Sequence, residues 1–72
     1  MGRYFFHVIS ADRAFRDEEG RSFPTLPDAI AFAAVVAGEL SRKGEDYQGF
    51  EVCVADERGR EVARVPIEGD AN

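Results

Sequence analysis

The sequence offers few side chains that could carry out chemistry, and it places them far apart. His7 is the single histidine and Cys53 the single cysteine of the 72 residues. A histidine can act as a general base or a metal ligand, and a cysteine can be redox active. Here the histidine has no second histidine or obvious nucleophile nearby, and the cysteine has no Cys-x-x-Cys partner. We interpret Cys53 as an inert, partly buried thiol and His7 as a structural strand residue, which is still the best candidate for a functional role.

Carboxylates form the second group with chemical potential. Residues 17–21 and 56–60 both follow the pattern Asp-Glu-x-Gly-Arg. Their spacing differs from the Asp-x-Asp-x-Asp-Gly loop of calcium sites, and neither glycine belongs to a phosphate-binding motif. Aspartate begins type I turns well and glycine supplies a left-handed position at the end, as in a hairpin with a bulge. We therefore expect solvated turn residues and neither a metal nor a cofactor. The carboxylates concerned are Asp17, Glu18, Glu19, Asp56 and Glu57.

One long helix, predicted over residues 26–43, must position everything else. Thr25 is the expected N-cap, because its hydroxyl can accept a hydrogen bond from the N–H of Asp28, and Pro27 suits the first turn. Gly44 is the expected residue after the C-terminus. At about 100° per residue, one apolar stripe faces the sheet. It contains Leu26, Ala29, Ile30, Ala33, Ala37 and Leu40.

The other side of this helix is more apolar than a helix covering one sheet requires. Phe32, Val35 and Val36 lie outside the stripe, and residues 29–38 contain no charged side chain. The run is shorter than the roughly 20 apolar residues that span a bilayer. An apolar helix is normally covered on more than one side, so we expect a homodimer through these three residues. The alternatives are an interface on the outer sheet face, a patch that stays exposed, or coverage by the loop of residues 44–49.

The remaining segments read as strands that alternate apolar and polar residues. They cover residues 3–10, 14–17, 50–55 and 61–67, with 21–23 as a brief extension. In the first strand the even positions face the core, and Phe5, His7 and Ile9 face outward. Pro66 indicates an edge or a strand end. The order β-β-α-β-β predicts an α+β domain, a small antiparallel sheet with one helix on one face. The expected core is Tyr4, Phe6, Val8, Leu26, Ile30, Leu40, Phe50, Val52, Val54 and Val65.

Composition narrows the class of protein. Residues 1–72 suffice for one small domain, with residues 68–72 as a frayed tail. So short a chain buries only about 60% of its unfolded surface, which makes a partner subunit a useful source of stability. The net charge of −5 opposes non-specific binding to nucleic acid. The N-terminus lacks the long apolar segment of a secretory signal, so we expect a cytoplasmic protein that does not associate with membranes.

Several short motifs together resemble an uncharacterised family of short bacterial proteins, catalogued as a domain of unknown function. They are RYFFHV at 3–8, DEEG at 17–20, Pro24 before the helix, DExGR at 56–60, and Val65-Pro66. The resemblance covers nearly the whole chain and implies a bacterial origin and a stand-alone domain. It implies no activity, cofactor or catalytic residue. Proteins of this pattern usually carry charged residues around positions 30, 32 and 35, where this chain has Ile30, Phe32 and Val35.

Two hypotheses of function follow. The first is a non-catalytic interaction module that self-associates or binds an unidentified protein. The second is a small ligand-binding domain or enzyme that uses His7 and nearby carboxylates. The orientation of His7 separates them, because a side chain directed to solvent, away from any pocket or carboxylate, would leave the second hypothesis without its only candidate.

Overall fold

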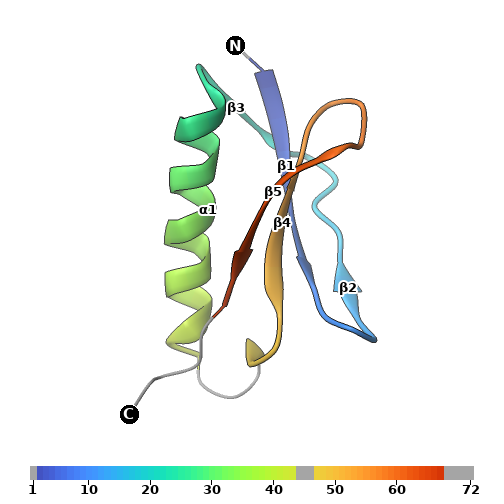
Figure 1. Ribbon diagram of the computed structural model, residues 1–72, viewed down its shortest axis with the longest axis vertical. Coiled ribbons are helices and arrows are strands. Elements are labelled where there is room, and N and C mark those ends of the chain that lie inside the picture. Colours follow the sequence, from blue (N-terminus) through green and yellow to red (C-terminus); the bar gives the residue numbers. More distant parts are fainter. Residues whose placement is uncertain (1, 44–46, 68–72) are drawn as a thin grey trace.

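One helix lies across one face of an antiparallel sheet in the computed structural model, which describes residues 2–43 and 47–67 (Figure 1). The described elements follow the order β-β-β-α-β-β, which confirms the α+β class and adds a third strand where only a brief extension was expected. The elements are β1 (Gly2–Ile9), β2 (Ala14–Phe15), β3 (Arg21–Phe23), α1 (Leu26–Ser41), β4 (Glu51–Ala55) and β5 (Glu61–Pro66).

β1 is the strand around which the sheet is assembled. The strands follow the order β2-β1-β4-β5, and β3 also pairs with β1. Each pairing is antiparallel. β5 therefore lies at an edge and ends at Pro66, as the proline predicted.

The pairing of β2 and β3 corrects our interpretation of residues 17–21 as a hairpin turn. Val8 pairs with Phe15 and Tyr4 pairs with Arg21, so residues 16–20 lie opposite only residues 5–7. The N–H of Phe6, between the two pairings, donates to the Asp17 carboxylate, which keeps the segment on the same edge of β1. Residues 16–20 are thus a bulge within one interrupted strand, and the chain does not reverse there.

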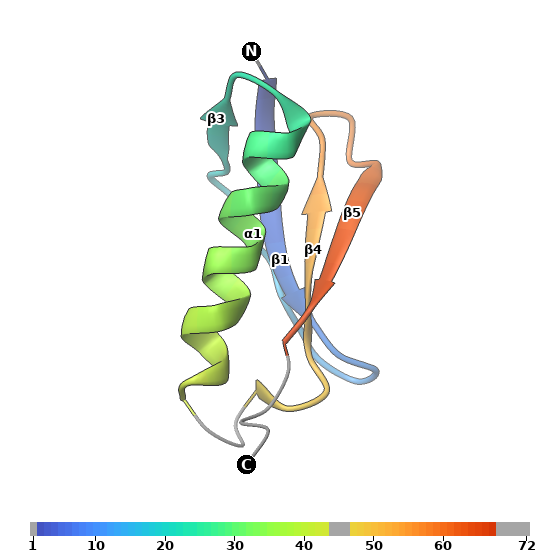
Figure 2. The same ribbon diagram turned by 60° about the vertical axis from the view of Figure 1, so that its left-hand side comes forward.

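The core lies between the alanine face of α1 and the sheet. Ala29 and Ala33 are fully buried, as are Val52 and Val54 of β4. Figure 2 shows the helix in front of the sheet, where it contacts β1, β3, β4 and β5. Phe6 and Val52, both expected in the core, are 9% and 0% exposed. Most of the other expected core residues also contribute, with Phe50 buried and Tyr4, Val8, Leu40 and Val65 packed against the core, whereas Leu26 and Ile30 are only partly buried.

Phe32 and Val36 have surroundings that the helical periodicity did not anticipate. The ring of Phe32 lies 5.0 Å from that of Phe6 and 5.3 Å from that of Phe23 on β3. The guanidinium of Arg21 lies 4.9 Å from the centre of the same ring. Val36 is also partly buried against the core. β3 extends the sheet beneath this side of the helix, so that of the three expected interface residues only Val35 is largely exposed.

The ends of the helix follow its capping signals closely. The N–H of Asp28 donates to the Thr25 hydroxyl, which confirms Thr25 as the N-cap. The helix ends at Ser41, two residues before the expected end, with Arg42 as its C-cap. Gly44 and the expected frayed tail at 68–72 lie outside the described residues.

Replacing Phe32 tests whether this side chain belongs to the core. We expect Phe32→Ala to lower the free energy of unfolding by about 3 kcal/mol, the lower end for a buried phenylalanine, because the site is half-buried. The matched control is Phe15→Ala, since Phe15 is 50% exposed and its ring contacts Phe50 at 6.0 Å and the Arg13 guanidinium at 5.8 Å. Urea denaturation measures both losses. Equal losses in the two variants would contradict a core role for Phe32.

Candidate functional site

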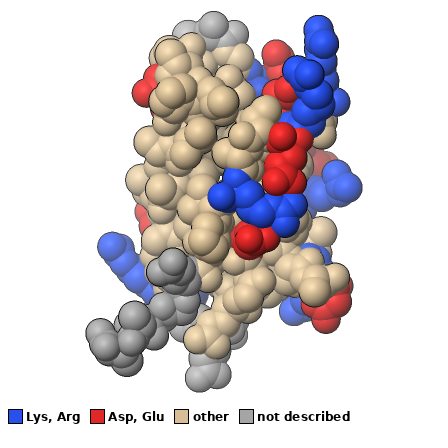
Figure 3. All heavy atoms as spheres, viewed as in Figure 1, with Lys and Arg blue, Asp and Glu red and all other residues tan. Residues whose placement is uncertain are grey.

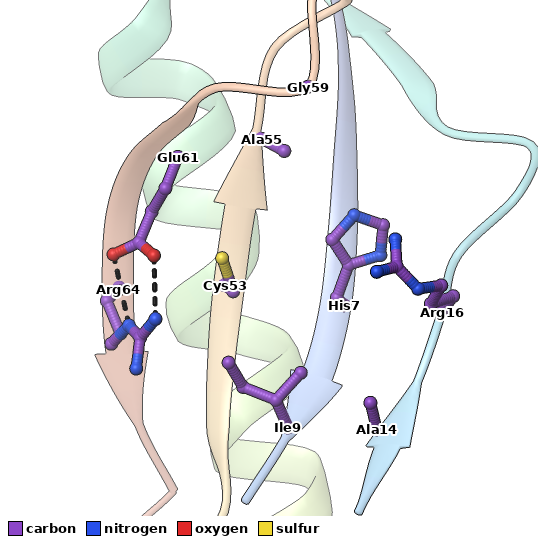
Figure 4. A pocket seen from close by; sticks show the side chains of 9 residues that line it. All are labelled: His7, Ile9, Ala14, Arg16, Cys53, Ala55, Gly59, Glu61 and Arg64. Atoms are coloured by element: carbon purple, nitrogen blue, oxygen red, sulfur yellow. Dashed lines mark hydrogen bonds and ion pairs between the residues drawn. The ribbon is translucent and has the colours of Figure 1, made fainter.

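A groove of about 250 Å³ crosses the sheet face opposite the helix (Figure 4). Its floor comes from outward-facing side chains of β1 and β4, where His7 pairs directly with Cys53. β5 adds Arg64 to this line of neighbouring residues across the sheet, because Cys53 pairs with Arg64. Arg16 borders the groove on the β2 side, and Glu61 borders it on the β5 side. The remaining lining residues are Ile9, Ala14, Ala55 and Gly59.

The backbone of the bulge holds His7 in place. The N–H of Asp17 donates to His7 Nδ1 at 3.0 Å. Because Nδ1 accepts this hydrogen bond, Nε2 is the ring nitrogen that remains available for a further contact. Figure 4 shows the ring between Arg16 and Cys53, over the floor of the groove. His7 therefore lies in a groove and is not directed away from every pocket, so the second hypothesis keeps its candidate.

The carboxylate of Asp17 is occupied by backbone donors. Oδ2 accepts from the N–H of Phe6 at 3.1 Å, and Oδ1 accepts from those of Glu19 and Gly20 at 3.1 Å each. Burial opposes ionisation, but these hydrogen bonds from Gly20, Phe6 and Glu19 outweigh it and hold the pKa of Asp17 below its ordinary value. The Asp17 carboxylate therefore has a structural role: it accepts the hydrogen bonds of backbone N–H groups at the bulge.

Gly20 completes the bulge because only a glycine fits there. Its φ is +70°, in the left-handed region. A Cβ at this position would lie 2.8 Å from the ring of Phe5 and 2.9 Å from the carbonyl oxygen of Tyr4. The bulge therefore packs directly on the outward-facing ring of Phe5 and covers one end of the sheet face opposite the helix.

The far wall of the groove is a paired charge cluster. Arg64 donates to both oxygens of Glu61, at 3.0 and 2.6 Å, and to Glu51 at 2.8 Å. The hydrogen bonds from Arg64 hold the pKa of Glu61 below its ordinary value. These charges satisfy one another on the surface, where such pairs contribute little to stability.

Cys53 is a poor nucleophile in this setting. It is only 8% exposed, although it points away from the helix. Burial raises the pKa of the thiol, and the Glu61 carboxylate raises it further. His7, its neighbour across the strands, already accepts the N–H of Asp17 through Nδ1. Among residues 2–43 and 47–67, no group of three or more His, Cys, Asp or Glu side chains could hold a metal ion.

The outward face of α1 is the second candidate site. Val35 is 57% exposed, and Ala31, Ala34 and Gly38 beside it are exposed as well. Few charged side chains appear over α1 in Figure 3, whereas they gather over the strands. A shallow groove of about 240 Å³ flanks this face. It is lined by Ala34, Ala37, Gly38, Ser41, Val65 and Pro66. This is an uncharged surface suited to contact with another apolar surface.

Fold and sites together define a small single-helix α+β domain with a fixed histidine in an open groove and an uncharged helix face. A family model described as a domain of unknown function, DUF6894, matches residues 3–68. The chain belongs to this family. No curated protein and no solved structure matches it. In the part of the chain that the structure describes, no helix is long and apolar enough to cross a membrane.

Sequence reasoning found His7 and Cys53 but not their environment. Arg16 was missed as a groove residue, because its position depends on the bulge that follows it. Among the hydrogen bonds of the described residues, none joins the carboxylate of Glu18 or Glu19 to His7. Asp17 contacts His7 through its backbone N–H and not through its carboxylate. The left-handed glycine that the pattern predicted at the end of residues 17–20 is confirmed, because Gly20 has a φ of +70°.

Replacing Asp17 tests the structural role of its carboxylate. Asp17→Asn retains fewer acceptor sites for the three backbone N–H groups, so we expect a loss of about 1–2 kcal/mol near neutral pH. The folded-state pKa of Asp17 is lowered from 3.8, so its contribution is present above that value and is lost as the pH falls through the folded-state pKa. Urea denaturation from pH 7 to pH 2 should show the gap between wild type and variant closing below about pH 4. A gap that is constant with pH, or as small as that of the exposed control Asp12→Asn, would contradict this role.

Alkylation of Cys53 tests the inert thiol. Burial and a raised pKa should make its reaction with iodoacetamide at pH 8 at least ~10-fold slower in the folded protein than in urea. The control is a cysteine introduced at exposed Ala11, measured in a Cys53→Ala background. Folded Cys53 that reacts as fast as this control would contradict the assignment.

Proposed function

We propose that this protein is a cytoplasmic, non-catalytic bacterial interaction module that self-associates as a homodimer through the outward face of α1. The observation that carries the proposal is the exposure of Val35, 57%, at the middle of a helix face without charge between Asp28 and Glu39. Fully burying a valine stabilises by roughly 1.5–3 kcal/mol. In a two-fold dimer each copy buries the same patch, so the gain is made twice.

The size of the domain supports this proposal. The buried part of α1 consists of alanines, and the largest fully buried side chains of the described residues are two valines. Such a core stabilises a small domain only modestly, because each alanine removes little apolar area from water. A second subunit over Val35 would bury a side chain that the monomer leaves 57% exposed.

The groove around His7 favours a second candidate function, the binding of a small ligand. Arg16 and the imidazole lie on one side, over an apolar floor that includes Ile9 and Ala55. The volume, about 250 Å³, is below the ~300–1,000 Å³ typical of ligand pockets. We rank this function second, since the groove is also open and its opposite wall is already internally paired.

Sedimentation equilibrium tests self-association and its surface together. We expect wild type to be dimeric at high micromolar concentration and Val35→Glu to be monomeric, because the substitution places two carboxylates in an apolar contact. The matched control is Phe15→Glu, at the other largely exposed hydrophobic side chain of the described residues. A monomeric wild type would refute the proposal, and a dimer disrupted by Phe15→Glu alone would move the interface to the β2 edge.

A further inference from the structure

Gly38 is a residue that the isolated chain does not explain. It lies inside α1, where glycine is less favourable than alanine because it loses more backbone entropy on folding. A Cβ built at this position would meet no other described atom within 4 Å, outside its chain neighbours and the nearby backbone of its own helix. Packing within the described residues therefore does not require glycine here. Close approach of a second backbone would require it.

The residues around Gly38 have the spacing of a helix-pairing surface. Successive intervals of three, four, three and four residues separate five exposed positions of α1 and its C-cap. This is the repeat that keeps one seam of a helix facing a partner helix. At about 100° per residue the positions fall opposite the buried alanines. We call this set the outer seam: Asp28, Ala31, Val35, Gly38 and Arg42.

Charge decides how two outer seams can meet. Within its five positions the seam is acidic at its N-terminal end, at Asp28, and basic at its C-terminal end, at Arg42, and exposed Glu39 borders it next to Gly38. Parallel helices would place like charges together at both ends. Antiparallel helices related by a two-fold axis place Asp28 of each copy beside Arg42 of the other, and they also oppose the two helix dipoles.

We propose that α1 pairs antiparallel with α1 of a second copy of this chain through the outer seam, with two reciprocal Asp28–Arg42 contacts. This proposal rests on the proposed self-association and specifies its geometry. Ala31 and Gly38 let the two backbones approach closely. In this register Val35 of each copy lies against Val35 of the other at the two-fold axis, next to the shallow groove whose lining includes Ala34 and Gly38.

Charge reversal tests this geometry. Asp28→Arg and Arg42→Asp should each weaken dimerisation about tenfold, because each replaces two attractive contacts by two repulsive ones. The double variant Asp28→Arg/Arg42→Asp should return the Kd to within about threefold of wild type, since it restores opposite charges. The double variant also controls for the helix cap, where the Thr25 hydroxyl donates to Asp28, because it loses that contact too.

Two further variants make the result specific. Asp12→Arg changes the net charge as much as Asp28→Arg does but lies outside α1, and we expect it to leave the Kd unchanged. Gly38→Leu should abolish the dimer while dilute protein retains its wild-type circular dichroism and an unfolding midpoint no lower than that of wild type, because no described atom lies near the added Cβ and leucine favours a helix more than glycine does.

The outcomes separate this inference from the proposed function. A monomeric wild type refutes self-association and the seam with it. If the wild type is dimeric, three results would each refute the antiparallel seam alone. They are a Kd unchanged in both single reversals, a Kd that the double reversal does not restore, and a dimer that persists in Gly38→Leu. Weakening by each single reversal, restoration by the double one and loss with Gly38→Leu support it.

Discussion

The close contact between the alanines of α1 and β4 is the constraint on which the rest of the structure depends. Ala29 and Ala33 have no exposed surface, and neither do Val52 and Val54 beneath them. Small side chains let the helix approach the sheet closely, which buries the centre of the domain without large residues. The larger Phe32 then packs beside this contact, against Phe6 and Phe23, where β3 widens the sheet.

The bulge between β2 and β3 is the second determinant of the fold. The Asp17 carboxylate accepts the N–H of Phe6 in place of a strand carbonyl, so β1 keeps its hydrogen bonding where its partner strand is interrupted. The backbone of Asp17 also fixes the imidazole of His7. The same few residues thus allow β3 to reach the helix and shape one border of the groove on the opposite face.

The two faces of the domain differ in what they offer a partner. The open sheet face presents paired charges, a nearly buried thiol whose pKa is raised, and a histidine whose Nδ1 already accepts a hydrogen bond. The helix face presents an exposed valine among small residues, with opposite charges at its two ends. We propose a second copy of the same chain as the partner of this face, because two copies related by a two-fold axis would present the same apolar and charged groups to each other.

The sequence by itself determined the elements whose signals are local. Thr25 and Pro27 marked the start of the helix, alternation marked β1, β4 and β5, and these patterns identified most of the core and the α+β class. Local patterns identified His7 as a candidate residue, but they did not predict the groove around it.

Only the tertiary structure decided which residues pack against each helix or strand. Two copies of the pattern Asp-Glu-x-Gly-Arg fold with similar hydrogen bonds from backbone N–H groups to Asp17 and to Asp56, yet the first forms a bulge and the second reverses the chain between β4 and β5. The difference arises from long-range pairing, since residues on both sides of the first pair with β1. That same pairing brings β3 beneath Phe32 and leaves Val35 exposed, which helical periodicity could not distinguish because it records the direction of a side chain and not what covers it.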